Sequence, residues 1–183
     1  MIERCRRFIS EDFGLAPAEV DSIMRRVYNR GHRLMLCFVT AHALLALYQA
    51  RFYGTWVPTV AVIVVGVGGY LASLVLGPET RLARIAGGIT LQGFVALFIY
   101  QLHGLPEMHF YHFTTQTMLV IYEDWLVGWP SALLTIMGEY VLAVLNTGRA
   151  ELHSFPDTYV TFQKLHLHFG ILLVQTTDRK SVV

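Results

Sequence analysis

The chain alternates long apolar segments with short polar stretches, and the segments have the length of helices. They cover residues 34–50, 56–76, 85–102, 108–122, 125–145 and 159–176. A helix needs about 20 residues, and at least about 17, to cross a ~30 Å hydrocarbon layer. Segments 56–76 and 125–145 meet that length outright, and the others meet it when their polar ends are counted. Strands are disfavoured because lipid accepts them only in closed barrels with alternating faces, and VAVIVVGVGGYLASLVL does not alternate.

These segments predict an all-α membrane bundle of six transmembrane helices at 34–177, preceded by a charged leader at 1–33. The leader mixes charges throughout and lacks the apolar core of a signal peptide. Behind Pro17, apolar residues recur at three- and four-residue intervals, which predicts a short amphipathic helix before the membrane. These residues are Val20, Ile23, Met24 and Val27.

The distribution of Arg and Lys predicts the orientation, because short loops rich in these residues stay in the cytoplasm. The leader is rich in arginine, and the loop before the third segment adds Arg81 and Arg84. The opposite side carries only Arg51, Arg149 and Lys164. We therefore expect both termini to face the cytoplasm.

The composition supports a membrane protein and excludes several other classes. The chain is 54% hydrophobic and 15% charged, whereas a soluble domain carries about a quarter charged residues. A net charge of +1 with 13% aromatic residues is incompatible with disorder and gives no reason to expect nucleic acid. Two cysteines, Cys5 and Cys37, do not make a disulfide framework.

Histidines are frequent for so apolar a chain, and most lie in or beside the predicted spans. Six of the eight do so: His42, His103, His109, His112, His166 and His168. Ionisable groups at membrane depth are costly, so they usually face the bundle interior and mark a site. His109 and His112 share a helix face, whereas His166 and His168 are about 200° apart. We expect a cluster in the outer half of the bundle formed by His42, His109, Glu139 and one of the last pair, most simply His168.

Imidazoles with a carboxylate suit zinc, copper or iron, and two histidines can hold a haem iron from both sides. The candidate metal ligands are His42, His109, His112, Glu139 and His168, and the candidate haem b ligands are His42, His109 and His168. The alternative is that these histidines are hydrogen-bonded interior residues that tie helices together. No serine stands in a nucleophile elbow or triad pattern, so we expect no enzymatic activity from the residues present.

The stretch ALFIYQLHGLPEMHFYHFTTQTMLVIYEDW resembles the six-helix membrane input domain at the amino end of bacterial methyl-accepting chemotaxis proteins, sensor histidine kinases and diguanylate cyclases. In that family Gly-x-x-Glu-x-His-Phe opens the fourth helix and Tyr-x-Asp-Trp closes it. The matching residues are Gly104, Glu107, His109, Phe110, Tyr122, Asp124 and Trp125. Further matches are His42 in AHALLAL and His168 ahead of Gln175 and Thr176, so that the similarity covers residues 24–177.

The chain departs from the family pattern at two places. Gly138 and Glu139 stand where relatives often have paired histidines on helix five, and Tyr100 stands where helix three often carries a histidine. The resemblance implies a multi-pass domain of the bacterial inner membrane. It also implies a homodimer that senses a signal and passes a conformational change to a cytoplasmic output module and its chemotaxis or two-component partners.

The chain ends in DRKSVV, which the start of a common sequencing adapter would encode. We hypothesise that Asp178 to Val183 are an artefact or the truncated start of a signalling linker, and that the natural chain continues into an output domain such as a histidine kinase or diguanylate cyclase. The alternative is a genuine polar tail. Three functions stay open: a sensory domain that detects a ligand, metal or redox change near the outer face, a small b-type cytochrome or metal-binding membrane protein, and a scaffold whose histidines only pack.

Overall fold

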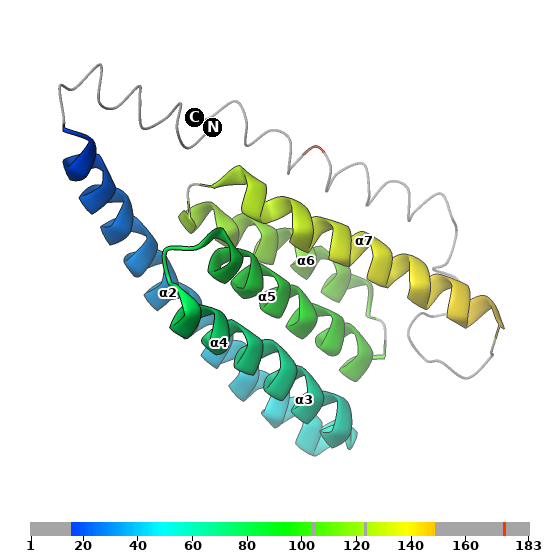
Figure 1. Cartoon of the computed structure of the whole chain (residues 1–183). Helices are drawn as coiled ribbons and strands as arrows, with labels where there is room; N and C mark the ends of the chain where they lie inside the picture. The colour runs from blue at the N-terminus through cyan, green and yellow to red at the C-terminus, as the bar shows by residue number, and fades with distance from the viewer. Residues whose placement is uncertain (1–15, 104, 123, 149–173, 175–183) are drawn as a thin grey trace.

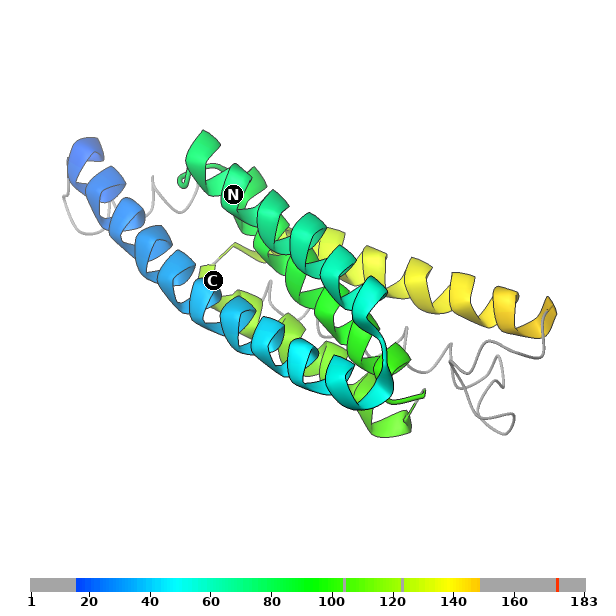
Figure 2. The same cartoon turned by 90° about the horizontal axis from the view of Figure 1, so that it is seen from below.

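The computed structural model describes residues 16–103, 105–122, 124–148 and 174, and every element in this part of the chain is helical. The elements are α2 (Pro17–Tyr53), α3 (Trp56–Val62), the π-helical η1 (Ile63–Val67), α4 (Gly68–Leu76), α5 (Arg81–Gln101), α6 (Pro106–Met118), the 3-10 helix η2 (Leu119–Tyr122) and α7 (Trp125–Gly148). Figures 1 and 2 show them packed side by side as a bundle. The prediction of an all-α fold is confirmed for these residues.

By length and apolar composition, three helices in the described part are able to cross a membrane. They cover Ala18–Tyr53, Trp56–Leu76 and Arg81–Gln101, and Leu126–Gly138 is a shorter apolar stretch. The predicted spans over 108–122 and 125–145 correspond to α6 with η2 and to α7. The predicted sixth span, 159–176, lies outside the described residues except for Val174, and so do the first 15 residues and 178–183.

Helix α2 joins two elements that the sequence pattern predicts to be separate. The short leader helix and the first span form one continuous helix of 37 residues. Pro17 occupies the first turn, the Glu19 carboxylate accepts a hydrogen bond from the Ala16 amide at 3.0 Å, and Gly54 ends the helix with a φ of 67°. No proline interrupts residues 18–53, so nothing breaks the helix where its composition changes.

Residues 56–76 form one helical stretch of spanning length, with the predicted bounds, but the π-helical segment η1 interrupts its regular hydrogen-bond ladder. The Thr90 hydroxyl on α5 shares its single proton between the Gly66 carbonyl within η1 at 3.0 Å and the Ala86 carbonyl at 2.8 Å. A single π turn in an α-helix leaves backbone groups with altered partners. One carbonyl of the widened turn is therefore satisfied by a side chain from the neighbouring helix.

Helix α5 is the central element, because it packs against α2, α3, α4, α6 and α7. It begins at Arg81, four residues before the predicted start of the third span at residue 85. Two small residues let other helices approach: a Cβ on Gly88 would lie 3.1 Å from the Leu119 side chain, and one on Gly87 would lie 3.2 Å from Met35 and Tyr70. Such close approach is typical of helix packing in membranes.

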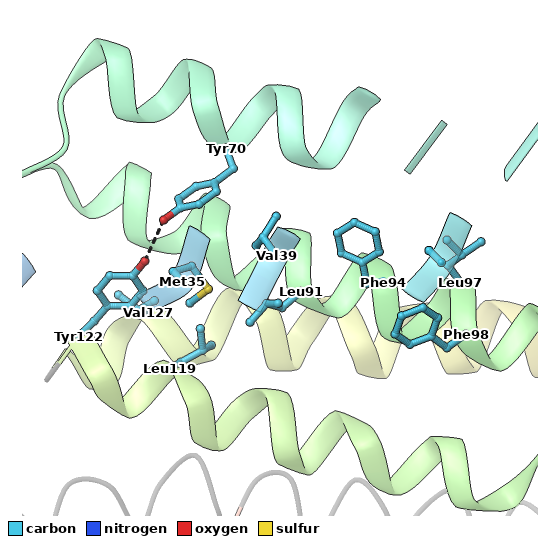
Figure 3. Packing of buried hydrophobic residues seen from close by; sticks show 11 residues of the cluster. Met35, Val39, Tyr70, Leu91, Phe94, Leu97, Phe98, Leu119, Tyr122 and Val127 are labelled. Carbon is cyan, nitrogen blue, oxygen red and sulfur yellow. Dashed lines mark hydrogen bonds between the residues drawn. The ribbon is translucent and has the colours of Figure 1, made fainter. Parts of the chain in front are cut away.

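The apolar core runs along the bundle between α2 and α5. It comprises Met35, Val39, Ala46, Tyr70, Leu91, Phe94, Leu97, Phe98, Leu119, Tyr122 and Val127. Figure 3 shows the tyrosine pair at one end of this row and the two phenylalanines toward the other. In contrast, large apolar side chains on α3 and α4 face outward, among them Val57, Val75 and Leu76. An exposed apolar face of this kind is what a helix presents to lipid.

Candidate functional site

A histidine and a tyrosine join α2 to α6 inside the apolar bundle. The ring of His42 is buried, and its Nδ1 lies 2.6 Å from the Phe38 carbonyl oxygen, while its Nε2 lies 2.9 Å from the Tyr111 hydroxyl. A carbonyl can only accept, so Nδ1 carries the proton and Nε2 accepts from the tyrosine. The ring also contacts Phe94 and Phe98 of α5. We call the hydrogen-bonded residues His42 and Tyr111 the His42 pair.

A second histidine, further toward the start of α2, bonds to two tyrosines. His32 Nε2 donates to the Pro78 carbonyl at 2.7 Å, and its Nδ1 lies 3.0 Å from the Tyr70 hydroxyl and 3.1 Å from the Tyr122 hydroxyl. The two hydroxyls are 3.2 Å apart (Figure 3). One of the two hydroxyls therefore donates to His32 Nδ1, and the second hydroxyl donates to the oxygen of that hydroxyl. We call His32, Tyr70 and Tyr122 the His32 cluster.

The His42 pair and the His32 cluster connect the same two segments of the chain at two levels. The histidines are 10 residues apart on α2, and Tyr111 and Tyr122 are 11 residues apart on α6 and η2. At a rise of 1.5 Å per residue these separations are about 15 and 17 Å. The two segments thus run antiparallel with matched spacing, and each polar contact holds the register that the other requires.

A buried ion pair lies beside the His32 cluster and links α5 to the start of α7. Arg84 and Asp124 side chains are only 2% and 3% exposed, with Nη2 and Oδ2 3.0 Å apart. Asp124 also accepts from the half-exposed Arg81 at 3.3 Å and from the Leu126 amide at 3.2 Å, as a helix N-cap does. The Arg84 guanidinium lies 4.1 Å above the Tyr28 ring of α2 and donates to the Glu79 carbonyl at 3.0 Å.

A further polar contact, made by His112, joins α6, α5 and α7. His112 Nδ1 lies 2.6 Å from the Gln92 side-chain oxygen and 3.4 Å from the Thr135 hydroxyl. Because the amide oxygen only accepts, Nδ1 carries the proton here as well. The Gln92 amide nitrogen is buried and has no hydrogen-bond partner among the described residues. His109, one turn earlier on α6, is buried with Nδ1 3.3 Å from the Leu105 carbonyl oxygen.

The structure describes the side chains of three of the five predicted ligand residues. His42, His109 and His112 are buried in the bundle. Glu139 lies in α7, its side chain is not among those described, and His168 lies outside the described residues. Within the described part, no three His, Cys, Asp or Glu side chains come close enough to hold a metal ion. Both ring nitrogens of His42 are engaged, so it could ligate a metal or haem iron only if the Tyr111 hydroxyl moved away.

The residues matched to the sensory motif divide between surface and interior. Glu107 and Phe110 are exposed on α6, whereas Tyr122 and Asp124 are buried in the His32 cluster and the ion pair. Trp125 begins α7. The closing half of the motif thus lies at the polar end of the bundle.

Sequence reasoning did not select His32, Tyr70, Tyr111 or Gln92, and it treated Arg84 as a loop charge. His32 follows the arginine-rich part of the leader, so the sequence pattern groups it with residues expected to be exposed. The available signal was its position on the helical face of Tyr28, Met35 and Val39, all buried. That face becomes visible only when α2 is read as one helix.

The chain was compared with protein families, curated proteins and solved structures. No family model, no curated protein and no solved structure matches it.

We predict strongly non-additive effects of Tyr70→Phe and Tyr122→Phe. After either single change the other hydroxyl still donates to His32 Nδ1, so the cost should stay near 1 kcal/mol. The double variant leaves that buried acceptor without a donor, and we expect a further loss of about 1–3 kcal/mol. Unfolding of the four proteins in detergent micelles measures this, and costs that add within about 0.5 kcal/mol would contradict it.

We also predict that Asp124→Asn destabilises the protein far more than Glu79→Gln. The first change leaves the buried Arg84 without its charge partner, at a cost of about 3–5 kcal/mol. The second removes the Arg25–Glu79 pair, whose side chains are 62% and 52% exposed, so the cost should stay below about 1 kcal/mol. Both variants lose one carboxylate and are compared by thermal unfolding, and equal losses would mean that burial of the pair is unimportant.

Proposed function

We propose that the chain is a membrane-embedded sensory input domain with six transmembrane helices and both termini in the cytoplasm. The observation that carries this proposal is the pair of polar levels between α2 and α6–η2, the His42 pair and the His32 cluster. The three apolar helices of spanning length and the motif shared with bacterial sensory domains support it. The arginine-rich start of α2 supports the orientation.

A plain membrane anchor has no need for these buried groups. Burying a polar group costs free energy unless it is hydrogen-bonded, removing the Arg84 and Asp124 charges from water costs several kcal/mol per ion that their pairing must offset, and ionisable residues inside membrane bundles generally serve a function. Here the buried groups lie at the places where helices meet and not on one helix alone. Their arrangement therefore suits a mechanism in which a movement of one helix changes the hydrogen bonds of its neighbour.

In the proposed mechanism, a ligand, metal or redox change near His42 alters the His42 pair. Since α2 is one continuous helix, a shift or rotation at His42 reaches His32 about 15 Å away. There it changes how Tyr70 and Tyr122 share the imidazole, next to the Arg84–Asp124 ion pair. The stimulus favours one of two helix packings by binding it more tightly. The predicted last span, residues 159–176, then passes the change to the output module.

We predict that Tyr111→Phe, which removes the donor to His42 Nε2, loosens the distant His32 cluster. Amide hydrogen exchange should rise in residues 28–35 and 119–127 as well as near the mutation, by about fivefold for a coupling of about 1 kcal/mol. Tyr100→Phe is the matched control, because this tyrosine is exposed on α5. Exchange that changes only around residues 38–46 and 106–115 would mean that the two levels are not coupled.

Reporter fusions test the proposed topology. A green fluorescent protein fused after Val183 should fluoresce in bacterial cells, and alkaline phosphatase at the same place should be inactive, because both report a cytoplasmic carboxyl end. Phosphatase inserted between α5 and α6 should be active. An active phosphatase at the carboxyl end would refute six spans with both ends inside.

A further inference from the structure

Three arginines form a stripe on the exposed side of α2. Arg26, Arg30 and Arg33 follow one another by four and three residues, which places them on one helix face, and all three are exposed. Figures 1 and 2 show the start of α2 extending beyond the neighbouring helices, whereas the opposite side of α2 at the level of the stripe contacts the loop between α4 and α5 through His32 and Pro78. The stripe is therefore open to whatever surrounds the bundle.

The same face of α2 changes from charged to apolar and back to charged. After Arg33 it continues through exposed Cys37, Leu44 and Tyr48, the last two both 64% exposed, to Arg51. Arg51 follows Arg33 by 18 residues, which is about 27 Å along a helix. This distance matches a hydrocarbon layer of ~30 Å, so Arg33 lies at the depth of the lipid headgroups. Arg30 lies about 5 Å and Arg26 about 10 Å further out.

Within the part of the chain that the structure describes, the stripe differs from three neighbouring arginines, which are paired with carboxylates. Arg25 pairs with Glu79 at 3.1 Å, and Arg81 and Arg84 pair with Asp124. Among the described residues, Arg26, Arg30 and Arg33 have no acidic partner within ion-pair distance. With Arg33 at headgroup depth and Arg30 and Arg26 successively further out, the stripe offers three positive charges to an external anion.

We propose that Arg26, Arg30 and Arg33 bind the phosphates of anionic phospholipid headgroups in the cytoplasmic leaflet. Guanidinium groups bind phosphate through two parallel hydrogen bonds, and anionic lipids concentrate in that leaflet. The inference rests on the proposed function in so far as the chain spans the membrane with this end inside. It adds that α2, which bears His32 and His42, is also held by lipid.

The test uses the full chain purified in a neutral detergent, with thermal unfolding followed while phosphatidylglycerol is added. We expect a saturable rise in the unfolding temperature that phosphatidylcholine does not produce. The triple variant R26Q/R30Q/R33Q should need at least about tenfold more lipid, since three charge-assisted contacts are lost. Arg51→Gln, on the same face at the opposite end, is the matched control and should respond as the wild type does.

Several outcomes would overturn the proposal. A triple variant that still responds as the wild type does would show that the lipid binds elsewhere, and an equal response to inorganic phosphate would show a site for a free anion. If the triple variant does not fold, single Arg→Gln variants replace it, and each should weaken the phosphatidylglycerol response. The reporter fusions separate this result from the proposed function: a wrong topology refutes the sensory arrangement, whereas a missing lipid response with the expected topology refutes only the lipid surface.

Discussion

A buried polar side chain in an apolar helical bundle needs a partner of the right kind on a neighbouring helix, because no water reaches it there. This requirement fixes how α2 faces the other helices. His32 needs a donor at Nδ1 and an acceptor at Nε2, and it finds them on Tyr70 or Tyr122 and at the Pro78 carbonyl. A rotation of α2 by one residue, about 100°, would remove both partners at once. The packing of the bundle therefore depends on the hydrogen bonds of a few polar residues as much as on its apolar core.

The size of the residues around the His32 cluster follows from the same requirement. Tyr122 reaches His32 by passing two glycines: a Cβ on Gly31 would lie 3.0 Å from its ring, and one on Gly87 would lie 3.4 Å from its hydroxyl. Larger residues there would push the tyrosine away from the imidazole. These glycines serve the close approach of a large polar side chain, which is a more specific reason than general helix packing.

The apolar pattern predicted the all-helical class because a helix-length run of apolar residues has few other solutions in lipid. It also placed most helix bounds to within a few residues. It could not place Arg84, which resembles a loop charge next to Arg81, because only the neighbouring helices reveal that Asp124 and the Tyr28 ring surround it. Periodicity identifies the buried face of a helix but not its neighbour. His42 could thus be selected as an unusual residue, whereas its partner Tyr111 could not.

Helix α2 combines two opposed surfaces, and this arrangement limits how the helix can move. Taking Arg26 as the reference, Arg30 and Arg33 lie within about 40° of it, whereas His32 and His42 lie about 120° and 160° away. One side is therefore exposed, whereas the other packs against the bundle. Helix shifts in signalling proteins are about 1–2 Å. The hydrogen bonds of His42 to Tyr111 and of His32 to Tyr122 measure 2.9 and 3.1 Å, and a shift of this size directed along them would lengthen them to about 4–5 Å, beyond hydrogen-bonding distance. A displacement of α2 must accordingly break both contacts and form others, which favours two discrete packings over a continuous range.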